Sequence, residues 1–333
     1  MARQVRIQFQ GAVYHVMGRG DRRENIIGDD KDRRMFIETF GEACEKTGWL
    51  VYAWVLMSNH YHLVFQTPQA NLVAGMRWLQ NTYTRRFNVG NQLWGHVFGS
   101  RYKAVMVETR EFGSGDYLSN LIDYVHLNPI RAGMINTATE SLLDYPWSSL
   151  SRGYAVSPKK RPSWLKTDDG FGILGLEDSV KGRRLYGRRL EEKARQGVIV
   201  PELPEDQSLQ STLRRGWYWG SEQFRAFLLK KLDPEAIRRN RNYQSTQTGR
   251  DHAHAEAERI VRDGLQRFGL SESDLKSLPG SDPRKVAIAG TIHKETTTLL
   301  GWTAKRLQMK SAANVSQQLR RNVSAYRRVG GSA

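Results

Sequence analysis

Apolar residues recur at two different spacings along the first 130 residues. Runs with β-branched and aromatic residues, or with alternating polarity, predict strands at 11–19, 49–57, 60–67 and 101–108. Apolar residues three and four apart predict helices at 30–47, 71–88 and 111–127. The order β-α-β-β-α-β with a further helix is typical of the ferredoxin-like split βαβ pattern. We therefore predict an α+β domain with an antiparallel sheet and helices on one face.

The remaining chain has a different pattern. Residues 157–162 and 181–184 are basic and punctuated by Pro or Gly, which predicts connectors. A short helix is expected at 222–232, a polar linker at 237–248 and a last helical unit at 253–328. The sequence thus predicts a domain over residues 1–150, a basic connector region with short helices over 151–250 and a helical domain over 251–333.

The C-terminal pattern fits a helix-turn-helix. A helix at 283–300, a short helix at 301–307, a turn at 308–311 and a helix at 312–321 follow one another. Ala304, Leu307, Val315 and Leu319 are the apolar contacts that such a unit needs. The exposed face of its last helix offers polar side chains for base edges and phosphates: Asn314, Gln317, Gln318, Arg320 and Arg321. The alternative is a plain helical bundle.

Composition then narrows the class of protein. The 333 residues carry 51 Lys+Arg and 34 Asp+Glu, a formal charge of +17, and 39% are hydrophobic. This excludes a disordered polycation and favours a polyanionic partner such as nucleic acid. Residues 1–150 hold 16 basic and 14 acidic residues, or +2, and the rest hold 35 and 20, or +15. Nearly all of the excess positive charge thus lies after residue 150, and we expect that part of the chain to attract the polyanionic partner.

Several classes of location and cofactor are disfavoured by the same sequence. The single cysteine, Cys44, excludes an intrachain disulfide framework and a cysteine-based zinc cage. No apolar run approaches the ~18 residues of a membrane span, and the first residues lack a signal-peptide pattern. We expect a cytoplasmic protein with no membrane partner.

Two histidines mark the predicted strand 60–67. Alternation places His60 and His62 on one face, whereas Tyr61, Leu63 and Phe65 point to the other. Two imidazoles at this spacing can share a divalent metal. The alternative is a pair of ordinary exposed strand histidines.

A second group of polar residues ends the third predicted helix. Tyr124 and Asn128 are four residues apart and so share a helical face, and Pro129 closes the helix there. Asn128 is preferred as a third metal ligand over His126, which points away, although the choice between them stays open. Tyr124 also fits the role of a core tyrosine.

Together these groups would suit phosphodiester chemistry. A metal at His60, His62 and Asn128 would polarise a phosphodiester, and Tyr124 would attack the phosphorus and form a phosphotyrosine, so rejoining needs no nucleotide cofactor. Arg101 and Lys103 share a strand face and Arg131 follows the helix, so each is a candidate phosphate contact. Each of these three cations could equally be solvated charge.

Five separated motifs resemble the HUH-type tyrosine transposases, and most closely the REP-associated tyrosine transposases, over about residues 5–150. They are Gly11-Ala-Val-Tyr-His-Val, Arg19-Gly-Asp-Arg-Arg-Glu, Trp54-Val-Leu-Met-Ser-Asn-His-Tyr-His-Leu-Val, Gly95-His-Val-Phe-Gly-Ser-Arg-Tyr-Lys-Ala and Tyr124-Val-His-Leu-Asn-Pro-Ile-Arg-Ala-Gly. The helix-turn-helix also looks like units appended to larger members.

The resemblance implies cleavage and strand transfer of single-stranded DNA next to hairpins. His60 and His62 would bind Mg²⁺ or Mn²⁺, Tyr124 would be the sole nucleophile that leaves a 5′-phosphotyrosine and a free 3′-OH, and Asn128 matches the polar ligand after the tyrosine. Related enzymes work as dimers and REP-associated ones can be monomers, so the oligomeric state stays open.

Three other interpretations fit the sequence less well. A sequence-specific DNA-binding regulator with a vestigial catalytic site is the alternative to the enzyme, and the intact His60, His62, Tyr124 and Asn128 set disfavours it. An RNA-binding ferredoxin-like module would leave the same residues unexplained. The segment Asp251-His-Ala-His-Ala-Glu-Ala-Glu resembles a metal cluster but is expected to begin a solvated helix.

Overall fold

A computed structural model shows the fold. It describes residues 6–99, 101–112, 116–136, 138–172, 174–197, 217–232 and 247–329. The chain folds into two compact units, one over Arg6–Lys231 and a second from Leu232 onwards. Each unit has its own core, and each is described by itself.

The first unit is built on a five-stranded sheet with the order β2-β3-β1-β4-β5. Its strands are β1 (Ala12–Arg19), β2 (Leu50–Leu56), β3 (His60–Thr67), β4 (Lys103–Val107) and β5 (Tyr218–Trp219). Strand β1 pairs antiparallel with β3 and β4, and β2 pairs antiparallel with β3. This order, read with the intervening helices, is the predicted ferredoxin-like pattern. The parallel pairing of β5 with β4 adds a strand that the sequence pattern did not predict.

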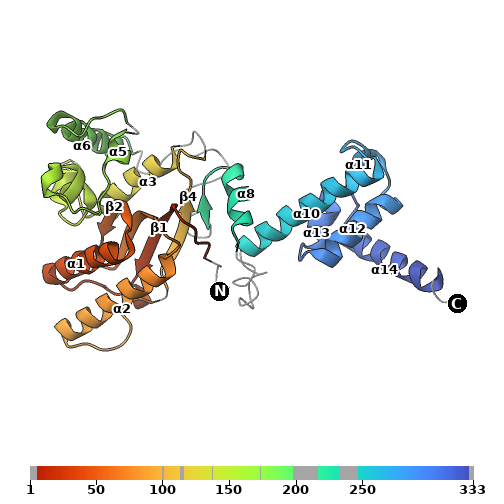
Figure 1. The fold of residues 1–333 in the computed structure, drawn as a ribbon, viewed down its shortest axis with the longest axis horizontal. Helices are drawn as coiled ribbons and strands as arrows, with labels where there is room; N and C mark the ends of the chain where they lie inside the picture. Colours follow the sequence, from red (N-terminus) through yellow and green to blue (C-terminus); the bar gives the residue numbers. More distant parts are fainter. Residues whose placement is uncertain are drawn as a thin grey trace. The chain divides into compact units, whose positions relative to one another are not determined.

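The helices of the first unit lie on both faces of the sheet (Figure 1). They are α1 (Asp30–Thr47), α2 (Leu72–Asn91), α3 (Tyr117–His126), α4 (Asn128–Arg131), α5 (Asp168–Gly172), α6 (Val180–Arg195) and α8 (Glu222–Lys230), with short helical turns at Asp21–Arg23, Leu142–Asp144, Leu150–Tyr154 and Pro158–Lys160. On one face, Phe36 of α1 packs on Tyr61 of β3 with ring centroids 5.1 Å apart. On the other, Tyr124 of α3 packs on His62, so the prediction of helices on one face only is wrong.

Aromatic packing fixes the face that carries α1 and α2. Trp49 stacks on Phe65 at 4.2 Å between centroids, and both side chains are buried. Gly18 of β1 lies opposite Tyr61, and a Cβ there would come within 2.4 Å of the phenol ring. Only glycine therefore permits this strand to cross the buried tyrosine so closely.

The basic segment 181–184 is not a connector. It lies inside α6, which Ser179 caps by accepting a hydrogen bond from the Gly182 amide. Tyr186, Leu190 and Ala194 recur every four residues and are buried, so this helix packs like any amphipathic helix. The prediction of a connector was wrong because it was based on the basic residues of this segment and overlooked the short apolar stripe of the helix.

The second unit is helical. It contains α10 (Gln247–Phe268), α11 (Asp274–Ser277), α12 (Pro283–Glu295), α13 (Leu300–Arg306) and α14 (Ala312–Val329). Most of the predicted linker 237–248 lies outside the described residues. Helix α12 ends five residues before the predicted end at Leu300, and an extended stretch leads to α13.

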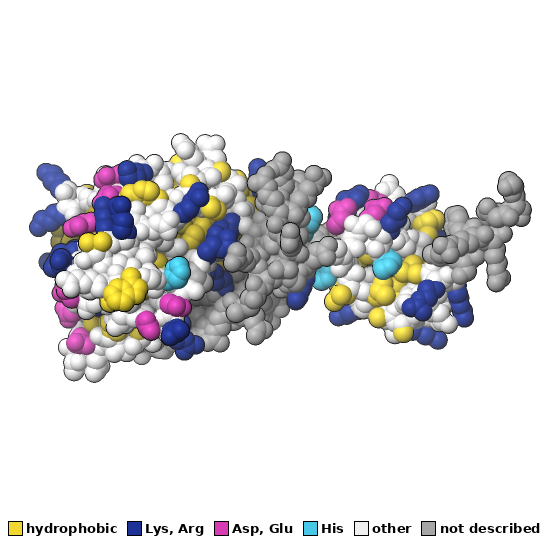
Figure 2. Space-filling view, turned by 90° about the horizontal axis from the view of Figure 1, so that it is seen from below, with side chains coloured by type: hydrophobic (Ala, Val, Ile, Leu, Met, Phe, Trp, Pro, Cys, Tyr) yellow, Lys and Arg dark blue, Asp and Glu magenta, His cyan; other side chains and the backbone are white. Residues whose placement is uncertain are grey.

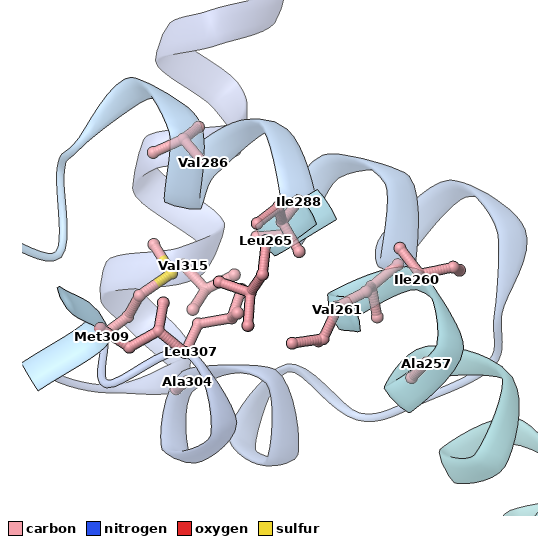
Figure 3. Packing of buried hydrophobic residues seen from close by; sticks show 13 residues of the cluster. Ala257, Ile260, Val261, Leu265, Val286, Ile288, Ala304, Leu307, Met309 and Val315 are labelled. Carbon is pink, nitrogen blue, oxygen red and sulfur yellow. The ribbon is translucent and has the colours of Figure 1, made fainter. Parts of the chain in front are cut away.

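The core of the second unit contains the apolar residues expected of a helix-turn-helix (Figure 3). Ala304, Leu307 and Val315 are buried in one cluster, and Leu319 packs against it. The turn between α13 and α14 passes through Gln308 at φ 51°.

Among the described residues, no helix is both long and apolar enough to cross a membrane.

Candidate functional site

Three histidines meet on the sheet face that packs against α3. His60 and His62 of β3 lie opposite Arg19 and Met17 of β1. His15 of β1 is fully buried, and its Nε2 lies 2.9 Å from Nδ1 of His62, so the two rings share a hydrogen bond. His15 was not predicted from the sequence, although its period-two position in β1 places it on the same face as His62.

Burial keeps these imidazoles neutral. It lowers the pKa of His15 to about 3, with the Lys103 charge adding to the effect. Burial and then the Arg19 charge lower the pKa of His60 to about 4. The pKa of His62 is also well below its usual range, first because of burial and then because of His15 and His60. Neutral imidazole is the form that binds a metal.

The hydrogen bonds of the histidine pair fix which nitrogen is left for a ligand. Nδ1 of His60 lies 2.7 Å from the side-chain oxygen of Asn59, and Nδ1 of His62 is held by His15. In both rings Nε2 is therefore the nitrogen left to bind a ligand. Metal-binding histidines commonly have their other nitrogen held in this way.

Tyr124 lies against this histidine group. Its ring centroid is 5.8 Å from that of His62 and 6.1 Å from that of His15. The guanidinium carbon of Arg131 lies 4.4 Å from the centre of the Tyr124 ring. Nη1 of Arg131 is buried and has no hydrogen-bond partner among the described residues. A guanidinium N–H in this state beside the tyrosine is suited to an anion such as a phosphate.

Asn128 and His126 have different environments. The Asn128 side-chain amide donates to the Tyr124 carbonyl at 2.9 Å, which leaves its side-chain oxygen available. His126 is fully buried and uses both ring nitrogens, one at 2.7 Å from Ser149 Oγ and the other at 3.1 Å from Tyr186 OH. Of the two alternatives, Asn128 is thus the one with a free donor atom.

Two of the three predicted phosphate contacts, Lys103 and Arg131, lie close enough for their charges to act on His15 and His62. Lys103 pairs with Met17, which pairs in turn with His62, so all three lie in one row across the sheet. Burial lowers the pKa of Lys103 to about 8. Arg101 is exposed, and its charge acts on Arg6 and Tyr102.

Helix α6 holds the helix that carries Tyr124. Asp123 is 3% exposed and accepts two hydrogen bonds from Arg189, at 3.0 and 2.8 Å, and one from Lys193 at 2.6 Å. The Tyr186 hydroxyl that bonds His126 belongs to the same helix. These contacts are made by residues just before and just after Tyr124 in the sequence. They were not predicted, because helix α6 was not predicted.

Three of the five polar residues predicted on the exposed face of α14 are exposed. Gln317, Arg320 and Arg321 are exposed, whereas Asn314 and Gln318 are half-buried. Figure 2 shows, on one face of the molecule, Lys and Arg side chains in separate groups with acidic and hydrophobic side chains between them. His254, in the segment that resembles a metal cluster, stacks on Trp302 at 5.3 Å.

Comparisons with known proteins agree with the motifs of the first unit. Residues 8–126 match the family model described as IS200-like transposase, which confirms the predicted resemblance for that part of the chain. A solved structure described as a REP-associated tyrosine transposase bound to a REP hairpin is 18% identical. The match covers 49% of this chain and 89% of the other, with a TM-score of 0.38. No curated protein matches the chain.

Proposed function

We propose that the protein is a metal-dependent single-strand DNA endonuclease and strand transferase, a transposase that acts at DNA hairpins through Tyr124. The observation that carries the proposal is that the Tyr124 ring packs against both His62 and the Arg131 guanidinium. The match of residues 8–126 to IS200-like transposases supports it.

In the proposed step the Tyr124 oxygen attacks the phosphorus of the scissile phosphodiester. The new bond is the tyrosyl phosphate ester on the 5′ side, and the bond to the 3′ oxygen breaks. The phenol loses its proton and the 3′ oxygen gains one, so a free 3′-OH results. Reversal by the 3′-OH of another strand completes strand transfer and restores the phenol. Arg131 would donate to the phosphate oxygens, and Lys103 would add positive charge to the same face.

The residues fit a divalent metal such as Mg²⁺ or Mn²⁺. Nε2 of His60, Nε2 of His62 and the side-chain oxygen of Asn128 would be the donors, and burial keeps the two imidazoles neutral. Among the described residues, no group of three or more His, Cys, Asp or Glu is arranged to hold a metal ion. We propose the amide oxygen of Asn128 as the third donor. When bound, the metal would polarise the phosphodiester and offset its transition-state charge.

The C-terminal unit would bind DNA in a separate way. Its α13–turn–α14 segment buries the residues that a helix-turn-helix requires and leaves Gln317, Arg320 and Arg321 exposed on α14. We propose that α14 contacts the bases and phosphates of duplex DNA, which a hairpin stem provides.

A covalent-adduct assay tests the proposal. Hairpin-bearing single-stranded DNA is labelled at its 3′ end, because the fragment that carries this end stays attached to Tyr124. The DNA is incubated with protein and Mn²⁺, and the mixture is run on a denaturing gel. The wild type and Tyr117→Phe are expected to form a protein–DNA adduct, whereas Tyr124→Phe forms none. An adduct that persists in Tyr124→Phe excludes Tyr124 as the nucleophile.

A further inference from the structure

An apolar patch at the end of α2 is exposed. Trp94 is 91% exposed, the highest value among the large hydrophobic side chains that the structure describes. Val89 and Leu93 beside it are 75% and 54% exposed. A tryptophan is usually highly buried, so an indole presented to solvent calls for a partner with an apolar face.

The loop that carries Trp94 is held in place by hydrogen bonds to the backbone. Asn88 donates from its side chain to the Gly95 carbonyl at 3.0 Å, and the Leu93 amide donates to the Asn88 carbonyl at 2.8 Å. Further along, the Val97 carbonyl accepts from the Asp21 amide at 3.1 Å. The Trp94 loop is thus docked against the turn that follows β1.

This turn presents arginines. Arg19, Arg22 and Arg23 are exposed, and Arg22 and Arg23 have φ values of 46° and 69°. Two consecutive side-chain-bearing residues in the left-handed region store strain, and such strain clusters at functional sites. Asp21 is half-buried and accepts a hydrogen bond from the Arg22 amide, and Glu24 is the exposed carboxylate of the turn.

The arginine turn adjoins the histidine site. Arg19 lies opposite His60 in the β1–β3 pairing, and the Gly20 amide donates to the Asn59 carbonyl at 2.9 Å. Trp94 is three residues from Val97, so their Cα atoms are within about 11 Å of each other. The patch, the arginines and His60 therefore follow one another along one edge of the first unit.

We infer that Trp94, Arg19, Arg22 and Arg23 form a subsite for an unpaired nucleotide of the DNA strand, with its base on the indole and its phosphates on the arginines. The inference rests on the proposed function and adds the substrate element that this edge recognises. A flat apolar side chain beside a group of cations matches a base next to its phosphates, because aromatic stacking accepts any base and the arginines follow the backbone. A protein or membrane partner would not require an exposed indole and arginines next to a phosphodiester site.

Binding of an unpaired strand tests the inference without cleavage. The full-length Tyr124→Phe protein is titrated into a fluorescently labelled oligothymidylate and, separately, into a fully paired duplex. Adding Trp94→Ala is expected to weaken oligothymidylate binding about tenfold, equal to about 1.4 kcal/mol, and to leave duplex binding unchanged. Trp94→Phe, which keeps a stacking face, is expected to retain most of the affinity.

The outcomes separate this inference from the proposed function. Unchanged oligothymidylate affinity in Trp94→Ala, or an equal loss for duplex, overturns the subsite. So does a wild type that self-associates in sedimentation through Trp94, because a second copy would then cover the patch. A missing Tyr124 adduct in the wild type overturns the proposed function instead, whatever Trp94→Ala does to binding.

Discussion

The two units carry the same net charge but differ in the polar groups that are proposed to act in each. Residues 6–231 hold 32 basic and 24 acidic residues, and residues 232–333 hold 18 and 10, so each has +8. In the first unit the proposed chemistry depends on neutral, buried histidines beside one tyrosine. In the second, the proposed contacts are exposed side chains on α14. Bulk charge therefore does not tell the two apart, whereas the placement of a few polar groups does.

Both units also hold a cationic group next to their proposed functional helix, again in different ways. In the first, Arg189 and Lys193 bind the carboxylate of Asp123 beside Tyr124. In the second, Lys285 is fully buried and donates to the carbonyls of Leu275, Leu278 and Gln308 at 3.1 to 3.2 Å. The second arrangement ties the turn before α14 to α12 through backbone carbonyls.

The largest expected effect separates catalysis from duplex binding. His60→Ala and His62→Ala each remove an imidazole donor and are expected to slow Mn²⁺-dependent cleavage by about 100-fold or more, since even second-shell partners cost about 10–100-fold. Duplex affinity should not change. Single-turnover cleavage and fluorescence anisotropy measure the two effects, with His252→Ala as the control, and metal-dependent cleavage at the wild-type rate would remove the metal site from the account.

Removal of the Asp123 carboxylate is expected to have the second-largest effect. Asp123→Asn leaves Arg189 and Lys193 without their acidic partner, and we expect a loss of about 3 kcal/mol in the free energy of unfolding of the first unit. Urea denaturation of the full chain measures it. The exposed Arg195–Glu192 pair provides the control, because Glu192→Gln should cost less than about 1 kcal/mol. Equal effects of the two changes would contradict a supporting role for α6.

The corresponding change in the second unit is Lys285→Met. It leaves three carbonyls without the Lys285 donor and is expected to destabilise that unit by about 1–3 kcal/mol. Duplex binding should weaken with it, whereas Tyr124 adduct formation on unpaired DNA should persist. Lys276→Met, at an exposed position on α11, is the control. Adduct formation lost in parallel with duplex binding would show that the two functions are not separate.

Acid should affect the first unit through its buried histidines. Burial lowers the pKa of His126 to about 3, so the unfolded chain takes up a proton as the pH falls below about 6.5 while the native chain does not. Stability from this group is complete above pH 6.5 and is lost between about 6.5 and 3, by about 1.4 kcal/mol per pH unit. Urea denaturation between pH 6 and 4.5 measures the free energy of unfolding. As the pH falls, this free energy should decline less steeply in His126→Gln than in the wild type, by that amount per pH unit. Equal slopes in the two proteins would contradict the prediction.

The smallest effect concerns the exposed charge of α14. If Arg320 contacts a phosphate, Arg320→Gln should reduce the slope of log affinity for duplex against log salt by about 0.9. Arg262→Gln, on the exposed side of α10, should leave the slope unchanged. An unaltered slope in Arg320→Gln would remove that contact.

Much of the first unit could be predicted from local pattern. Strand β3 begins and ends where alternation placed it. Helix α1 spans the predicted residues 30–47, follows the Asp29 cap and ends before Gly48, which has φ 72°. Strand β5 could not be predicted, because two residues carry no periodicity and their pairing with β4 depends on a contact more than a hundred residues away. Which face α3 covers depends likewise on tertiary packing.

The candidate site was predictable in part for the same reason. His60, His62, Tyr124 and Asn128 follow from spacing within single elements and from motifs. His15 joins them only through the pairing of β1 with β3, and Arg189 reaches Asp123 across 66 residues of sequence. Arg101 was grouped with Lys103 by alternation, but β4 begins only at Lys103, so the alternation did not extend to it.

The most direct test of the central claim locates the DNA on the protein. After reaction with Mn²⁺ and nuclease digestion, trypsin is expected to release one modified peptide over residues 111–131, which contains both Tyr117 and Tyr124. Fragmentation by mass spectrometry should place the nucleotide on Tyr124. A nucleotide on Tyr117 or on another peptide would contradict the account.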